Sequence, residues 1–164
     1  MTDSQERTAL LERKLMDILG SIDFGARYYA YCDAHAGLSA DPKLQRADYE
    51  RVLNASGLPF KYYASERFFG HRDPRGAVTL ALNAVISRKD LELVLAIIRP
   101  QGTLGGTFHG LSHRLLTEAQ PDPVHTPKYP RLPFHSLTEF SAALDFGLGL
   151  YREALPLIVE QNWE

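Results

Sequence analysis

The stretch AVTLALNAVISRKDLELVLAIIRPQG, residues 77–102, contains two runs in which large apolar side chains occupy every second position. A period of two places these side chains on one face of a β-strand. The link Arg88-Lys89-Asp90 between the runs is too short for a crossover, so the two strands must be antiparallel neighbours. The stretch therefore predicts a hairpin whose core-facing residues are Val78, Leu80, Leu82, Ala84 and Ile86, then Leu91, Leu93, Leu95 and Ile97.

Turn sequences extend this hairpin on both sides. Asp73-Pro74-Arg75-Gly76 has Asp, Pro and Gly at the first, second and fourth positions of a type I turn, and Arg99-Pro100-Gln101-Gly102 repeats the Pro and Gly placement. The aromatic-rich segment 60–69 and the segment 103–108 then supply one strand each. We expect a four-stranded antiparallel meander over residues 60–108.

Helical patterns precede the meander. Apolar residues at helical spacing predict a first helix over residues 4–20. Asp23 is placed to cap a second helix, and Asp41 followed by Pro42 predicts the start of a third.

Two further helices are expected after the meander. Thr107 is placed to cap a short one, and the capping box Ser136–Glu139 opens a last one, which Pro156 should kink or end near Leu155. Gly147 and Gly149 thin this last helix where a neighbour can pack closely. The expected fold is one α+β domain, residues 1–164, with N-terminal helices, the four-stranded meander and C-terminal helices packed on the sheet.

The composition is that of a globular protein. The chain has 164 residues, of which 45% are hydrophobic and 23% are charged, and it has no apolar run long enough to span a membrane. The polar N-terminus lacks the apolar core of a signal peptide, and the single Cys32 suits a reducing compartment. We expect a cytoplasmic protein that has no membrane partner.

The charge is distributed unevenly. The net charge is −2, so nucleic acid is not an expected partner, but residues 61–135 carry ten Lys and Arg against six Asp and Glu. Residues 136–164 carry one against five. Two interpretations remain open: the basic middle and acidic end are solvated or face each other, or the basic middle presents a surface to an acidic partner.

GTLGGTFHGLSHRL, residues 102–115, is the stretch that most resembles a ligand-binding or metal-binding motif. It matches neither the dinucleotide-binding glycine pattern nor a P-loop, and the adjacent Gly105 and Gly106 indicate a bulge or a close backbone approach. His109 and His113 lie one helical turn apart, opposite the apolar side of their helix, so we expect them to be exposed.

Such a histidine pair can supply two ligands to zinc or nickel, but Gly110 replaces the glutamate of the H-E-x-x-H motif. A third ligand would have to come from His71, His125 or His135, all in expected loops. We therefore predict neither a metal nor a cofactor.

No arrangement of nucleophile and base stands out. Cys32 and His35 lie side by side on one expected helix, where the imidazole is poorly placed to activate the thiol. We expect Cys32 to be a packing residue, and the chain has neither a G-x-S-x-G motif nor a distinct pair of carboxylates.

Two segments combine basic and aromatic residues in a way that suits recognition of an acidic protein. One is the expected hairpin tip, and the other is the proline-rich loop 119–134, whose prolines keep it extended. This loop could serve as a lid, an interface or a passive strap. We hypothesise that these segments form or border one partner-binding surface, made of Arg67, His71, Arg72, Arg75, Lys128, Tyr129 and Arg131.

The sequence favours a non-catalytic protein-binding module of the bacterial cytoplasm, of immunity-protein or dedicated-chaperone type. The expected partner is another protein, and the basic surface favours an acidic one. A homodimer is also compatible with the sequence. The alternative is a small enzyme or ligand-binding protein with a pocket near Gly105, Gly106, His109 and His113.

Overall fold

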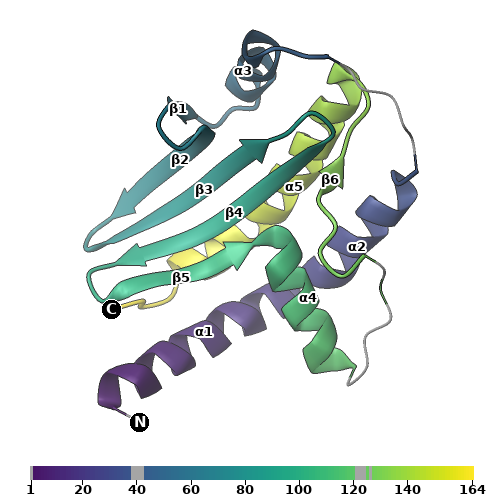
Figure 1. Ribbon diagram of the computed structural model, residues 1–164. Helices are drawn as coiled ribbons and strands as arrows, with labels where there is room; N and C mark the ends of the chain where they lie inside the picture. The colour runs from purple at the N-terminus through teal and green to yellow at the C-terminus, as the bar shows by residue number, and fades with distance from the viewer. Residues whose placement is uncertain (1, 38–42, 121–124, 126) are drawn as a thin grey trace.

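The computed structural model, which describes residues 2–37, 43–120, 125 and 127–164, has five helices and an antiparallel sheet of six strands (Figure 1). The helices are α1 (Asp3–Ser21), α2 (Phe24–Ala34), α3 (Arg46–Ala55), α4 (Phe108–Ala119) and α5 (Leu137–Val159). The strands are β1 (Lys61–Tyr63), β2 (Phe68–Arg75), β3 (Val78–Ile86), β4 (Asp90–Arg99), β5 (Gly102–Thr107) and β6 (Leu132–Pro133). The predicted α+β fold, with helices before and after an antiparallel meander, is confirmed.

The strand order is β1-β2-β3-β4-β5, and β6 adds a short pairing to β4. The central hairpin has the predicted form, since β3 and β4 pair from Thr79↔Ile98 to Ile86↔Leu91. The expected number of strands was too low. The aromatic segment 60–69 is divided by a turn into β1 and the start of β2, because Arg67 adopts a left-handed conformation (φ 58°) and Tyr63 pairs with Phe68.

The turn between β2 and β3 lies two residues later than predicted. Asp73 and Pro74 are part of β2, and the turn consists of Gly76 and Ala77, between the paired residues Arg75 and Val78. Gly76 has φ 65°, which suits the two-residue turns that match the twist of a hairpin. Pro74 is tolerated in the strand because β1 pairs no further than Gly70, so Pro74 lies on a free edge.

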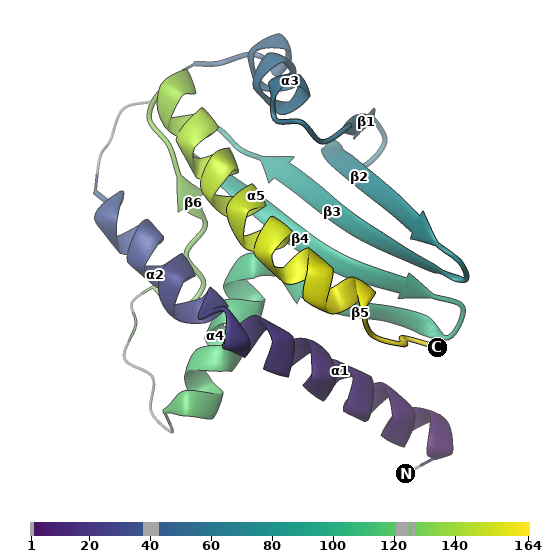
Figure 2. The same cartoon turned by 180° about the vertical axis from the view of Figure 1, so that it is seen from behind.

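One face of the sheet is covered by α5, which crosses it in Figure 2, while α1 packs against α5 and the β5 edge. We call this the covered face. The predicted inward residues of β3 and β4 are buried here, apart from the half-buried Ile86. Gly147 allows α5 to approach β4 closely, since a Cβ at this position would run into the side chain of Leu93. Gly149 has no such neighbour, so only one of the two expected close approaches is found.

The starts of α2 and α3 differ from the prediction. Asp23 precedes α2 as expected, but its backbone is left-handed (φ 55°) and its side chain makes no capping hydrogen bond. The third helix begins at Arg46 and not at Pro42, and Asp41 and Pro42 lie outside the described residues. At its start the Asp48 carboxylate accepts the backbone N–H of the N-cap residue Gln45 at 2.9 Å, as the third helical residue does in a capping box.

The last helix does not end near Leu155 but continues through Pro156 to Val159. Ile158, which is completely buried, holds this last turn in the core. Trp163 donates its indole N–H to the Ile158 carbonyl at 2.7 Å, so this helix-end carbonyl is satisfied. Packing of the helix end therefore outweighs the backbone hydrogen bond that a proline removes. Among all the helices described, none is both long enough and apolar enough to cross a membrane.

Candidate functional site

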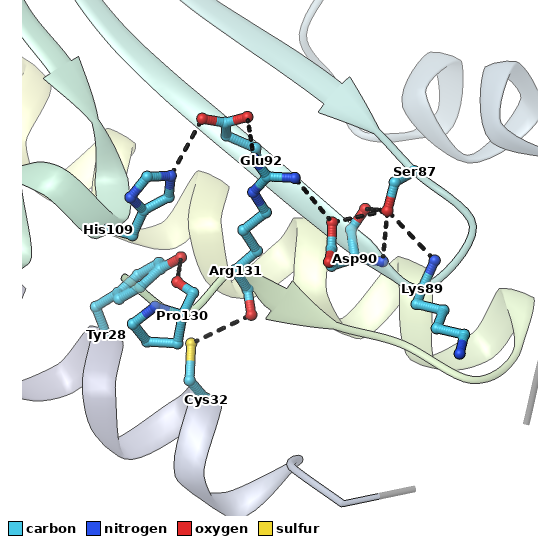
Figure 3. Close-up of polar contacts among 9 residues, drawn as sticks. All are labelled: Tyr28, Cys32, Ser87, Lys89, Asp90, Glu92, His109, Pro130 and Arg131. Carbon is cyan, nitrogen blue, oxygen red and sulfur yellow. Dashed lines mark hydrogen bonds and ion pairs between the residues drawn. The ribbon is translucent and has the colours of Figure 1, made fainter. Parts of the chain in front are cut away.

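Glu92 lies where β4 changes its pairing partner. β6 pairs with Asp90 and Leu91, whereas β5 pairs with residues 94–99, so Glu92 lies between the two partner strands. Its carboxylate contacts one side chain beside each partner strand: His109 Nε2 at 3.1 Å and Arg131 at 3.6 Å (Figure 3). Arg131 also lies 3.8 Å from Asp90. We call Glu92, His109, Arg131 and Asp90 the Glu92 cluster.

The position of His109 follows from the cap of α4. Thr107 ends β5, and its hydroxyl accepts the backbone N–H of Gly110 at 3.0 Å, which confirms the predicted N-cap. The same hydroxyl lies 3.2 Å from His109 Nδ1. If the hydroxyl donates to Nδ1, the neutral ring carries its proton on Nε2 and donates it to Glu92. The capping residue therefore also orients the imidazole toward the sheet.

The segment that carries Arg131 is held by α2. Tyr28 donates its hydroxyl to the Pro130 carbonyl at 2.7 Å, and the Cys32 thiol lies 3.7 Å from the Arg131 carbonyl (Figure 3). Tyr29 donates its hydroxyl to the Lys128 carbonyl at 2.8 Å. We call residues 127–134 the strap. Its carbonyls find partners on α2, so the described part of the proline-rich loop is laid along the domain and fixed to it.

His109 and His113 are not exposed as predicted. The side chain of His109 is only 15% exposed and is bonded to Glu92. His113 is half-buried, and its ring packs edge-on against Tyr129 with centroids 4.7 Å apart. The prediction considered only the helix itself, whereas Tyr129 of the strap covers the polar side of α4.

The chemistry that this region offers is limited. Burial raises the pKa of the Cys32 thiol to about 12, so it stays protonated and unreactive near neutral pH. Within the described ranges, no three His, Cys, Asp or Glu side chains gather closely enough to hold a metal ion. Of the three histidines considered as a third ligand, His71 contacts the Pro59 carbonyl, His125 contacts Asp33, and both ring nitrogens of His135 are buried. The Glu92 cluster therefore serves to join strand, helix and strap.

The two glycines of β5 are used for packing. Gly105 has φ 112°, and a Cβ at this position would overlap the Leu95 carbonyl, so the predicted close backbone approach is found here. Gly106 faces Leu111 of α4, whose side chain would lie 3.9 Å from an added Cβ. The alternative prediction was a ligand pocket beside these glycines, His109 and His113. It stays a prediction, and these contacts do not favour such a pocket.

The structure does not bring the seven predicted partner-binding residues together. Arg67 and Arg75 lie at opposite ends of β2, and His71 and Arg75 point to the same side as the buried Phe69. Arg72 points to the opposite side. Lys128, Tyr129 and Arg131 belong to the strap, which β3 and β4 separate from β2 (Figure 1).

The second face of the sheet, which we call the outer face, has no helix across it in the described chain (Figure 1). Its residues alternate with the buried ones, as in β4, where Val94 and Ala96 are half-buried and Ile98 is 37% exposed. Most of its positions are apolar or glycine. The face is made of Lys61, Tyr63, Phe68, Gly70, Arg72, Pro74, Thr79, Ala81, Asn83, Val85, Glu92, Val94, Ala96, Ile98, Thr103, Gly105 and Thr107.

Sequence reasoning missed the outer face and Glu92. A signal for the outer face was present, because Val85, Val94 and Ile98 place large apolar side chains between the inward ones. A strand with one solvated face normally has polar residues there. For Glu92 no comparable signal exists, because its two partners come from segments distant in the sequence.

The chain matches none of the protein-family models, curated proteins or solved structures with which it was compared.

Proposed function

We propose that this chain is a non-catalytic protein-binding module and that its partner docks on the outer face of the sheet. The observation that carries the proposal is the apolar character of a sheet face over which no helix of the described residues lies. Apolar side chains that remain in contact with water, such as the 37% exposed Ile98 on this face, are stabilised when a partner covers them.

The geometry of the outer face favours a protein over a small molecule. Along β4 its side chains lie on an antiparallel sheet that pairs with β3 on one side and β5 on the other, so the surface is broad. Small molecules prefer concave sites that bury most of their surface, whereas protein partners use broad surfaces. The opposite face of the sheet is packed against α5, so little ordering of the strands is needed on binding.

The chemistry around the Glu92 cluster agrees with a role in binding. Glu92 is engaged by His109 and Arg131, and the nearby Cys32 thiol has a pKa raised to about 12 by burial. Neither group is prepared to act as a nucleophile near neutral pH. The more specific hypothesis is an immunity protein or dedicated chaperone of the bacterial cytoplasm. It rests on the same reasoning, and identification of the partner would test it.

Site-specific photo-crosslinking in the native host tests the proposal. A photo-reactive amino acid replaces Ile98 on the outer face, and in a matched variant it replaces Leu10 on α1, which is 64% exposed. Leu10 is the stricter control, because it is apolar and more exposed than Ile98. We expect a discrete protein adduct from position 98 that is absent from position 10.

The absence of a protein adduct at position 98, under conditions in which the protein is folded and abundant, would contradict the proposal. The same adducts from both positions would also contradict it, since they would reflect general stickiness and not a docking surface.

A further inference from the structure

Arg72 is mounted on the outer face in a fixed orientation. Its Nη1 donates to the side-chain oxygen of Asn83 at 2.6 Å and to the His71 carbonyl at 3.2 Å. The guanidinium also lies over the ring of Tyr63, at 5.4 Å from the ring centroid. A side chain that is already ordered loses little conformational entropy when it binds a partner.

Gly70 makes this arrangement possible. A Cβ at this position would lie 2.8 Å from the Tyr63 ring, 2.9 Å from Arg72 Nη1 and 3.1 Å from the Asn83 oxygen. Any side chain here would displace at least one of the three. The missing side chain therefore lets Tyr63, Arg72 and Asn83 converge above the backbone of β2.

One edge of the guanidinium remains available. The contacts to Asn83 and His71 use Nη1, and the Nε and Nη2 groups donate to no acceptor within the described residues. These two groups form the fork that binds both oxygens of a carboxylate or a phosphate.

The charges on the outer face are not balanced. Lys61 and Arg72 form no ion pair with a carboxylate of the described residues, and Lys61 lies 5.3 Å from the same Tyr63 ring. The acidic residues on this side of β4 are already engaged, Glu92 by His109 and Arg131, and Asp90 by Ser87 and Arg131. A partner that covers this face therefore meets uncompensated positive charge beside β1 and β2, next to an apolar centre.

We propose that the partner docks through a protein segment rich in both acidic and apolar residues, and that Arg72 anchors it by binding a carboxylate. This inference rests on the proposed function and names the class of partner. The apolar side chains of the segment lie against Val94 and Ile98, and its carboxylates meet Arg72 and Lys61. Arginine and tyrosine, the residues that meet at this anchor, are enriched at binding hot spots.

The aromatic rings argue against a nucleic acid as the occupant. Tyr63 is stacked on Phe68 with centroids 4.8 Å apart and planes 13° apart, and Arg72 lies over the Tyr63 ring as well. These contacts engage the Tyr63 ring, which is therefore less available for stacking on a nucleobase. The remaining centre of the outer face is aliphatic, which suits apolar side chains of a protein.

The test uses the whole chain and a peptide of simple composition. The ¹⁵N-labelled protein is titrated with a short peptide in which glutamate alternates with leucine, and the amide shifts of Val94 and Ile98 report on the outer face. A matched peptide that alternates lysine with leucine, and an oligothymidylate of similar charge, serve as comparison ligands.

Arg72→Met and Arg75→Met form a matched pair, since both remove an arginine from β2 but Arg75 points to the other side and contacts Asp73. We expect Arg72→Met to weaken binding of the acidic peptide about tenfold and Arg75→Met to change it less than about twofold. Arg72→Lys, which keeps the charge but loses the fork, should give an intermediate loss. Thermal unfolding of each variant checks that the fold is retained, and Arg72→Lys carries the test if Arg72→Met does not fold.

Equal effects of Arg72→Met and Arg75→Met, or no shifts at Val94 and Ile98, would overturn the proposal. Tighter binding of the lysine peptide or of the oligothymidylate would also overturn it, the latter in favour of a nucleic acid. The crosslinking experiment separates the two proposals. An adduct from position 98 that persists in the Arg72→Met background keeps the protein-binding function but rejects the acidic anchor.

Discussion

The two faces of the sheet are built from the same strands, and both are largely apolar, but only one of them is covered. Along β4 the residues Leu93 and Ile97 are 1% and 0% exposed, whereas their neighbour Ile98 is 37% exposed. The covered face receives α5, with α1 beside it at the β5 edge, and the outer face receives no helix of the described chain (Figures 1 and 2). The contrast shows that apolar alternation identifies residues that avoid water, and that the covering layer decides which of them the fold itself buries.

Residues on the two faces should therefore contribute differently to the free energy of unfolding. Burial on the covered face contributes to the free energy of unfolding, because it removes apolar area from water within the chain itself. The outer face can gain the same free energy only when a partner covers it. Substitutions on the two faces test this separation.

The largest expected effect compares neighbours on β4. Leu93→Ala leaves a cavity beneath α5 and should lower the free energy of unfolding by about 2–5 kcal/mol. Val94→Ala, on the half-buried outer face, should lower it by about 1 kcal/mol or less. Denaturation by urea measures both. Similar losses for the two variants would show that the outer face is covered within the isolated protein.

The next effect compares the adjacent glycines of β5. Gly105→Ala forces an alanine to φ 112° and drives its Cβ toward the Leu95 carbonyl, so we expect a loss of about 2–3 kcal/mol. Gly106→Ala meets only Leu111 at 3.9 Å and should change stability by about 0.5 kcal/mol at most. Equilibrium unfolding again provides the measurement. If Gly106→Ala is the more damaging change, the described path of β5 is wrong.

A smaller effect concerns Cys32, which lies beneath the strap: the pH dependence of stability tests whether it is as well buried as residues of the covered face. Burial raises the pKa of Cys32 to about 12, above the ordinary thiol value of the unfolded chain. Between about pH 9 and pH 12 the unfolded state loses this proton first, so stability falls as the pH rises. Cys32→Ala should cost about 1 kcal/mol at neutral pH and flatten this decline above pH 9.

Unfolding curves recorded from pH 7 to pH 11 check this expectation. The pKa of Tyr29 is also raised to about 12 by burial, so part of the alkaline decline should remain in the variant. Identical pH profiles for the wild type and Cys32→Ala would show that the thiol is not buried. Fast alkylation of native Cys32 at neutral pH would contradict its burial independently.

The smallest expected effect lies on the outer face itself. Ile98→Thr keeps a β-branched side chain and should change the free energy of unfolding by about 0.5 kcal/mol or less. It should also lower the fluorescence of an apolar dye that binds exposed hydrophobic surface. Ile97→Thr, directly beside it but completely buried, is the control and should lose about 2–4 kcal/mol. Unchanged dye fluorescence in Ile98→Thr would contradict an apolar docking surface at this position.

Much of the fold could be predicted from local patterns. The central hairpin follows from alternation and a short link, and the caps at Thr107 and Ser136 follow from residue type, since each accepts the backbone N–H of the third residue after it. The errors also have local causes. The Asp73–Gly76 sequence suits a turn, but pairing of Asp73 with Leu80 extends the strand and moves the turn to Gly76 and Ala77.

The candidate site could be predicted only in part. Arg72 was included among the partner-binding residues, but so were His71 and Arg75, which point to the other side of β2. A turn was predicted at Asp73–Gly76, where the structure has the end of β2. Without the correct extent of this strand, the sequence could not show which of these three residues lies on which side of the sheet. The exposure of His109 and His113 was predicted wrongly because Tyr129, far away in the sequence, packs over them.

The sequence by itself determined the central hairpin, the side of its two strands that avoids water and the presence of helices before and after the meander, because these properties depend on residues close together in the chain. Only the tertiary structure decided that Glu92 joins β4 to α4 and the strap, that Arg72 is held by Tyr63 and Asn83, and that one face of the sheet has no helical cover among the described residues. These features depend on contacts between distant segments, and the free energy of such contacts is set by which surfaces meet after the helices have packed.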